Sequence, residues 1–151
     1  MIAPNGSAKV LEFNCRLGDP ETQPLMMRLK SDLLEILEAA VDGKLGAARA
    51  EWDSRPALGV VMAAEGYPGA IRKGDAIEGL DSAGGEVKVF HAGTVLKDGK
   101  AVTSGGRVLC VTALGATVRA AQAAAYSGVA KIRWKGVQYR SDIGYRAIAR
   151  G

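Results

Sequence analysis

Long apolar runs are absent from this chain of 151 residues. None approaches the ~20 consecutive residues that a membrane-spanning helix needs. The N-terminus also lacks the basic stretch and apolar segment that together form a signal peptide. We therefore expect no membrane insertion and no membrane partner.

Cysteine and histidine are scarce, with two cysteines and one histidine. Cys15 and Cys110 have neither metal-site nor redox spacing, which favours free thiols in a cytosolic chain. A zinc site would need further ligands at close spacing. A Ser or Cys nucleophile would need His91 as its base, and a lone strand histidine is more often a hydrogen-bonded structural residue.

Nucleotide-binding motifs of the common kinds are also missing. There is no Gly-x-x-x-x-Gly-Lys-Ser/Thr string, and no glycine-rich piece leads from a strand into a helix as a dinucleotide loop does. The 48% hydrophobic and 24% charged fractions are those of a globular protein of one or two small domains. The net charge of +4 is compatible with anionic ligands but does not identify one.

Hydrophobic spacing predicts a helix over 24–41, with a break near Ser31 because Asp32 and Glu35 can form a second capping box. A polar connection follows over 45–56, so we place a domain boundary between residues 52 and 53. The remaining predicted elements are strands over 57–64, 75–77, 87–96, 100–103, 107–114, 134–139 and 143–148, and a helix from 118 to about 132.

Local signals support three of these elements. Asp98-Gly99 is a strong hairpin signal, and Thr117 is a suitable N-cap for the helix that follows it.

Basic residues alternate with aromatic ones after residue 130, as on surfaces that bind single-stranded nucleic acid. We favour packing of the end strands instead, and expect no nucleic-acid partner.

A strand over 9–14 would carry the main candidate site. Alternation places Glu12 and Asn14 on one face, with Leu11 and Phe13 buried on the other. Residues i and i+2 lie about 6.6 Å apart, so both polar side chains can reach one magnesium ion, which prefers oxygen ligands. Arg16 would continue the row and suit a phosphate or carboxylate. Alternatively, Glu12 pairs with Arg16 and Asn14 starts a turn.

A second candidate is the string Gly105-Gly106-Arg107. Paired glycines let backbone N–H groups approach a phosphate, and the arginine adds charge. The alternative is a tight turn with a solvated arginine.

Several strings resemble the phosphoribosylamine–glycine ligase family of ATP-grasp enzymes, in order along nearly the whole chain. They are Glu12-Phe13-Asn14-Cys15-Arg16-Leu17-Gly18-Asp19-Pro20-Glu21-Thr22-Gln23, Gly66-Tyr67-Pro68-Gly69, Val89-Phe90-His91-Ala92-Gly93-Thr94, Gly105-Gly106-Arg107-Val108-Leu109 and Asp142-Ile143-Gly144-Tyr145-Arg146. The resemblance implies an α+β fold, in which residues 1–52 are the end of an ATP-grasp lobe. Residues 53–151 would be a small β-rich domain with one long helix.

The resemblance also implies roles for individual residues. Glu12 and Asn14 would be ligands of Mg²⁺ or Mn²⁺, and Arg16 would be a catalytic residue that steadies the phosphates. Asp19 and Glu21 would orient glycine, and the 105–107 string would lie beside the ligand cleft. ATP, glycine and phosphoribosylamine would be the small-molecule partners, in the cytoplasm.

The family's enzymes are larger, so we expect this chain to correspond to their C-terminal part and to lack ligase activity alone. The turn at 4–7 and the three residues before it suggest a hairpin with one short arm, and whether Met1 is a natural start is left open. The alternative function is a non-catalytic module. It would self-associate through Leu11, Phe13 and one side of the 24–41 helix.

Overall fold

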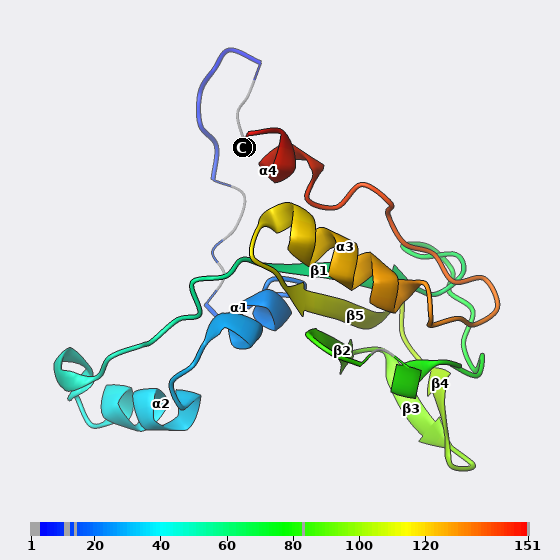
Figure 1. Cartoon of the computed structure of the whole chain (residues 1–151), viewed down its shortest axis with the longest axis horizontal. Helices are drawn as coiled ribbons and strands as arrows, with labels where there is room; N and C mark the ends of the chain where they lie inside the picture. Colours follow the sequence, from blue (N-terminus) through cyan, green and yellow to red (C-terminus); the bar gives the residue numbers. More distant parts are fainter. Residues whose placement is uncertain (1–3, 11–12, 14, 83, 151) are drawn as a thin grey trace.

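A three-stranded antiparallel sheet forms the centre of the molecule, with β1 (Ala57–Ala63), β5 (Arg107–Leu114) and β2 (Val87–His91) in the order β1-β5-β2. Figure 1 shows this arrangement in a computed structural model that describes residues 4–10, 13, 15–82 and 84–150. β5 lies between the other two strands, and all of its residues after Arg107 are buried. β5 is therefore covered on both faces of the sheet. The mixture of helices with antiparallel strands confirms the predicted α+β class.

Helix α3 (Val118–Val129) covers one face of the sheet (Figure 1). The Thr117 side chain accepts a hydrogen bond from the Ala120 N–H at 3.1 Å, which confirms the predicted N-cap. Gly128 brings helix and sheet together, since a Cβ there would lie 2.8 Å from Val87. The core beneath the helix contains Leu58, Val60, Met62, Leu109, Val111, Ala113, Ala121, Ala125 and Val129.

The opposite face of β1 and β5 is met by the short helix α1 (Thr22–Arg28). Gly59 permits this contact, because a Cβ at that position would lie 2.9 Å from the Cys110 sulfur and 3.4 Å from Pro24. The segment that carries the predicted site is thus packed directly against the β-rich region.

Helix α2 (Leu33–Val41) and the 3₁₀ turn η1 (Leu45–Ala47) extend away from the sheet (Figure 1). The predicted break in the helical run is confirmed, since the Asp32 carboxylate caps α2 by accepting from the Leu34 N–H at 2.8 Å. The chain then returns alongside itself, and the Asp53 N–H donates to the Arg28 carbonyl at 2.7 Å.

The predicted hairpin at Asp98-Gly99 is confirmed by β3 (Thr94–Lys97) and β4 (Lys100–Thr103). Both turn residues have positive φ, 49° and 76°, as a type I′ turn requires. The expected short strand at 75–77 is reduced to an isolated bridge between Ala76 and Val102.

The single strand expected over 87–96 is wrong, because the chain leaves the first sheet after β2 and enters a second sheet as β3. Gly93 causes the change of direction, since its N–H donates to the Arg107 carbonyl at 2.8 Å. A Cβ on Gly93 would lie 2.6 Å from the Gly105 Cα. A 3₁₀ turn, η2 (Leu80–Ser82), comes before β2.

The two closing strands expected over 134–139 and 143–148 are also wrong. The first forms only an isolated bridge between Ala63 and Gln138. The second contains most of helix α4 (Tyr145–Ala149), which begins after Gly144 turns the chain at φ 87°. Side chains of α3 hold this tail, and the Tyr126 hydroxyl donates to the Arg140 carbonyl at 2.6 Å. Strand pairing is therefore not what fixes the C-terminal segment.

The strand expected over 9–14 is not seen in its described residues, since 9, 10 and 13 lie outside any strand. Phe13, expected in the core, is 86% exposed, so that expectation is wrong too. An apolar strand face holds its register only when something covers it, and no described residue buries Phe13. Leu11, Glu12 and Asn14 lie outside the described residues. Among the described helices, none is long and apolar enough to cross a bilayer.

Candidate functional site

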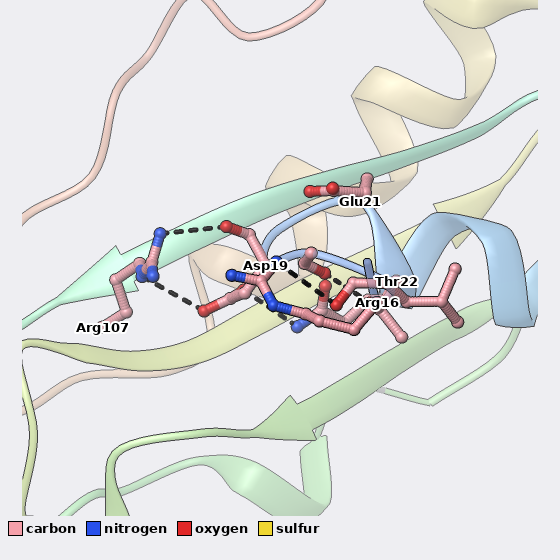
Figure 2. A pocket seen from close by; sticks show the side chains of 8 residues that line it. Arg16, Asp19, Glu21, Thr22 and Arg107 are labelled. Atoms are coloured by element: carbon pink, nitrogen blue, oxygen red, sulfur yellow. Dashed lines mark hydrogen bonds and ion pairs between the residues drawn. The ribbon is translucent and has the colours of Figure 1, made fainter. Parts of the chain in front are cut away.

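A polar pocket of about 740 Å³ forms where the loop before α1 meets the start of β5. Figure 2 shows its lining, in which Arg107 faces Asp19 across a sequence separation of 88 residues. The pocket is lined by Arg16, Leu17, Gly18, Asp19, Glu21, Thr22, Gln23 and Arg107. Four of the residues predicted for the site, Arg16, Asp19, Glu21 and Arg107, are therefore brought together.

Arg107 binds Asp19 through two separate contacts (Figure 2). Its Nε lies 3.1 Å from the Asp19 Oδ2 atom, and its Nη1 donates to the Asp19 main-chain carbonyl at 3.0 Å. A planar guanidinium that uses two nitrogens on one residue restricts both the side chain and the backbone of that residue. The loop is thereby attached to the sheet.

Gln23 completes the coordination of the Asp19 carboxylate. Its Nε2 donates to Asp19 Oδ1 at 3.1 Å, so both carboxylate oxygens are engaged. The Gln23 Oε1 atom is buried and has no hydrogen-bond partner in the described part of the chain. The Gln23 side chain is therefore held by Asp19 at the pocket wall.

The loop itself is closed by short-range contacts. The Thr22 hydroxyl and the Thr22 N–H both donate to the Gly18 carbonyl. The Glu21 carboxylate folds back over Gly18, and it occupies the space that a Cβ on residue 18 would need. A side chain at residue 18 would therefore displace the Glu21 carboxylate.

Arg16 and Glu21 are the charged lining residues that form no ion pair with another described residue. Arg16 makes only a long contact with the Leu17 carbonyl, at 3.5 Å. The site thus offers one cation and one carboxylate to a ligand that carries both an anionic and a cationic group.

The two glycines of the 105–107 string do not line the pocket, although Arg107 does. The Gly105 N–H donates to the Gly93 carbonyl at 3.1 Å, so it is not directed at a ligand. Gly106 lies against the Tyr67 ring, which takes up the room of a side chain. Close packing accounts for both glycines.

The predicted metal ligands Glu12 and Asn14 lie outside the described residues. Within the described ranges, no three His, Cys, Asp or Glu side chains gather as a metal site would require. The His91 Nδ1 atom shares a hydrogen bond of 3.0 Å with the Thr94 hydroxyl. His91 does not line the pocket. Burial raises the pKa of the Cys110 thiol, so it is a poor nucleophile.

Sequence reasoning did not single out Thr22 and Gln23. Both follow directly on the Asp-Pro-Glu string, and Gln23 stands four residues after Asp19, the spacing at which helical neighbours meet. That spacing was the available signal for a partner of Asp19.

Comparison with known proteins places the chain in a family. The sequence model described as phosphoribosylglycinamide synthetase, C domain, matches residues 57–146, which is more than half of the chain. The matched range runs from β1 to the start of α4. The chain belongs to the phosphoribosylglycinamide synthetase family.

Individual relatives agree with this assignment. Phosphoribosylamine–glycine ligase of Pseudomonas aeruginosa is 61% identical over 151 residues, and that of Pasteurella multocida is 59% identical over 150. The alignments cover 99% of this chain but 35% of each relative. A crystal structure of the ligase from Thermotoga maritima superposes with a TM-score of 0.70 at 38% identity, covering 95% of this chain and 35% of that one.

Proposed function

We propose that this chain provides the C domain and an adjoining active-site loop for an ATP-dependent phosphoribosylamine–glycine ligase. The observation that carries the proposal is the pocket in which Arg16, Asp19, Glu21 and Arg107 converge. The names of the relatives supply the reaction. The division into an ATP-grasp part (1–52) and a β-rich part (53–151) belongs to the same proposal, as does a cytoplasmic location, which the free thiols favour.

The reaction proposed for the complete enzyme has two steps. The carboxylate of glycine attacks the γ-phosphorus of ATP, which forms an acyl phosphate and releases ADP. The amine of phosphoribosylamine then attacks the acyl carbon and displaces inorganic phosphate, which gives glycinamide ribonucleotide. Such chemistry depends on positioning and on neutralising the charge of the transferred phosphoryl group.

The pocket residues suit these demands. Arg16 has no ion-pair partner among the described residues and would bind the phosphoryl oxygens or the acyl phosphate. Glu21 would hold the glycine ammonium. Asp19 would orient these groups, and Arg107 adds positive charge at the far wall.

The metal proposal rests on the sequence alone. Glu12 and Asn14 would hold Mg²⁺ or Mn²⁺, four and two residues before Arg16. An oxygen-donor pair of this kind fits a hard cation that keeps some of its water and shares phosphate oxygens. When bound, the ion would neutralise charge on the phosphates.

A chimera tests the proposal directly. This chain replaces the matching region of the Pseudomonas aeruginosa ligase, and phosphate release is measured with ATP, glycine and phosphoribosylamine. We expect activity within about tenfold of the parent, and Arg16→Met in the chimera should lower kcat by about a hundredfold, as loss of a transition-state charge contact does. The matched control is Arg133→Met, which removes an exposed arginine paired with Glu78. An inactive but folded chimera would refute the function.

The chain by itself should be inactive and should bind magnesium weakly, because two protein ligands hold a strongly hydrated ion poorly. Calorimetry with magnesium and ATP should give little heat. Tight one-to-one ATP binding by the chain alone would contradict the proposal.

The second candidate function, a self-associating module, is favoured by one observation. Leu34, Leu37 and Val41 on α2 are all more than half exposed. A second copy could cover this apolar face through a two-fold contact.

A further inference from the structure

We propose that Arg107 is a positioning residue, which acts on the reaction through Asp19 rather than by binding a substrate. The inference rests on the proposed function and concerns the same pocket. It assigns the C domain a specific task, which is to hold the active-site loop in place.

The guanidinium of Arg107 is already committed. Its Nε and Nη1 both contact Asp19, one at the carboxylate and one at the main-chain carbonyl. The Nε nitrogen carries a single hydrogen, so a substrate anion could use it only by breaking the ion pair with Asp19. The double contact to one residue is the geometry of a clamp.

The strand behind Arg107 is rigid. Val108 and Leu109, which follow it at the start of β5, are at most 1% exposed and lie in the main core. β5 is the central strand and pairs with both of its neighbours. A side chain on such a strand holds the residue that it binds at a fixed position relative to the sheet.

The loop, by contrast, is held mainly by itself. Thr22 donates its hydrogen bonds to the Gly18 carbonyl, and the side-chain amide of Gln23 donates to the Asp19 carboxylate. Among the described residues, the polar contacts that join residues 16–23 to the β-rich region are the hydrogen bond and the ion pair of Arg107. Without Arg107 the loop would lose its polar contacts with the sheet, and only the packing of α1 would still hold it there.

Arg16 precedes Asp19 by three residues, and Glu21 follows it by two. A shift of the loop would therefore displace both of the charged residues proposed to bind substrate. Misplacement by about 1 Å can cost about a hundredfold in rate. Arg107 consequently affects catalysis without touching the reacting atoms.

Amide hydrogen exchange on the chain itself tests the clamp independently of any activity. In Arg107→Met we expect the Thr22 amide, which donates to the Gly18 carbonyl, to exchange at least about fivefold faster, while those of β1 and β5 keep their rates. Arg107→Lys should give an intermediate result, because an ammonium cannot make the fork. Arg133→Met is the control. Unchanged exchange in the loop would overturn the proposal.

A double-mutant cycle in the chimera separates positioning from substrate binding. We expect Arg107→Met to lower kcat by about thirtyfold while the KM values for glycine and phosphoribosylamine change less than about threefold. In an Asp19→Asn background the same change should cost at most about threefold in kcat, because the two residues act together.

The opposite pattern would overturn the proposal. In that pattern Arg107→Met raises one KM at least tenfold and leaves kcat unchanged. The rise in KM is the same with Asp19 and with Asn at position 19. Arg107 would then bind that substrate directly. An inactive chimera instead refutes the proposed function, and the exchange experiment then decides the clamp alone.

Discussion

The β-rich region after residue 56 and the segment before it are held together in different ways. The first contains the buried core, with Val60, Met62, Val108 and Val111 fully inaccessible to solvent. In the described part of the chain before β1, Gly18 is the one buried residue. The earlier segment nevertheless contributes most of the pocket. The stable region thus supports a weakly stabilised segment that lines the pocket.

The largest effect should distinguish the two regions by stability. Leu109→Ala empties a core site that is 1% exposed, and should lower the free energy of unfolding by about 2–5 kcal/mol. Leu37→Ala removes the same atoms from α2, where the side chain is 53% exposed, and should cost less than about 0.5 kcal/mol. Urea unfolding measures both. Similar costs would show that α2 is as well packed as the sheet.

The attachment of α1 to the sheet provides a second test. Gly59→Leu fills the space that Pro24 and the Cys110 sulfur occupy, and overpacking of this kind costs about 1–3 kcal/mol. We expect the amides of α1 to lose protection from exchange while those under α3 keep it. Gly46→Leu is the matched control, since a Cβ there meets nothing within 4 Å. Equal loss of protection on both faces would mean that the molecule responds as one unit.

The exposed face of the earlier segment should make the chain self-associate at micromolar concentration. Phe13→Glu or Leu37→Glu should weaken that association by about tenfold, because each places a charge in an apolar contact. Leu96→Glu, at a leucine of the β3–β4 hairpin that is 74% exposed, should have no effect. Sedimentation velocity measures the change, and a monomer at all concentrations would contradict it.

The smallest effect concerns the ion pair beside the domain boundary. Arg55 donates to both carboxylate oxygens of Asp53 and lowers the pKa of Asp53 to about 2, from an ordinary 3.8. A lowered folded-state pKa stabilises the fold above pH 3.8, and this contribution is lost as the pH falls towards 2.

Asp53→Asn should therefore make unfolding less sensitive to pH over that interval. Urea midpoints at about pH 5 and about pH 2.5 would show a smaller difference than in the unsubstituted chain. Asp81→Asn, an exposed carboxylate, is the control. An unchanged difference in Asp53→Asn would show that this pair does not contribute.

Elements with strong local signals were predicted correctly from the sequence. The apolar run of β5, the Thr117 cap of α3 and the Asp98-Gly99 turn depend on neighbouring residues, and all three are confirmed. The predictions over 87–96 and 143–148 failed because distant contacts decide those segments. The distant contacts are the close approach of Gly93 to Gly105, and the hydrogen bonds of the Tyr126 hydroxyl with the backbone of Arg140 and Ile143.

The candidate site divides in the same way. Arg16, Asp19 and Glu21 are close in sequence, and a family string drew attention to them together. The resemblance placed Arg107 beside the cleft, but its contact with Asp19 could not be predicted, because it depends on how α1 lies over the sheet. The roles of Glu12 and Asn14 remain predictions.

The β3–β4 hairpin projects from the end of the molecule away from α1 and α2 (Figure 1). Its base is fixed by the close approach of Gly93 and Gly105, whereas its tip, Asp98-Gly99, is exposed. Exposed loop tips of this kind accept inserted sequence. A fluorophore or an affinity tag could therefore be introduced at the tip, giving a way to immobilise or track the protein while the pocket stays open.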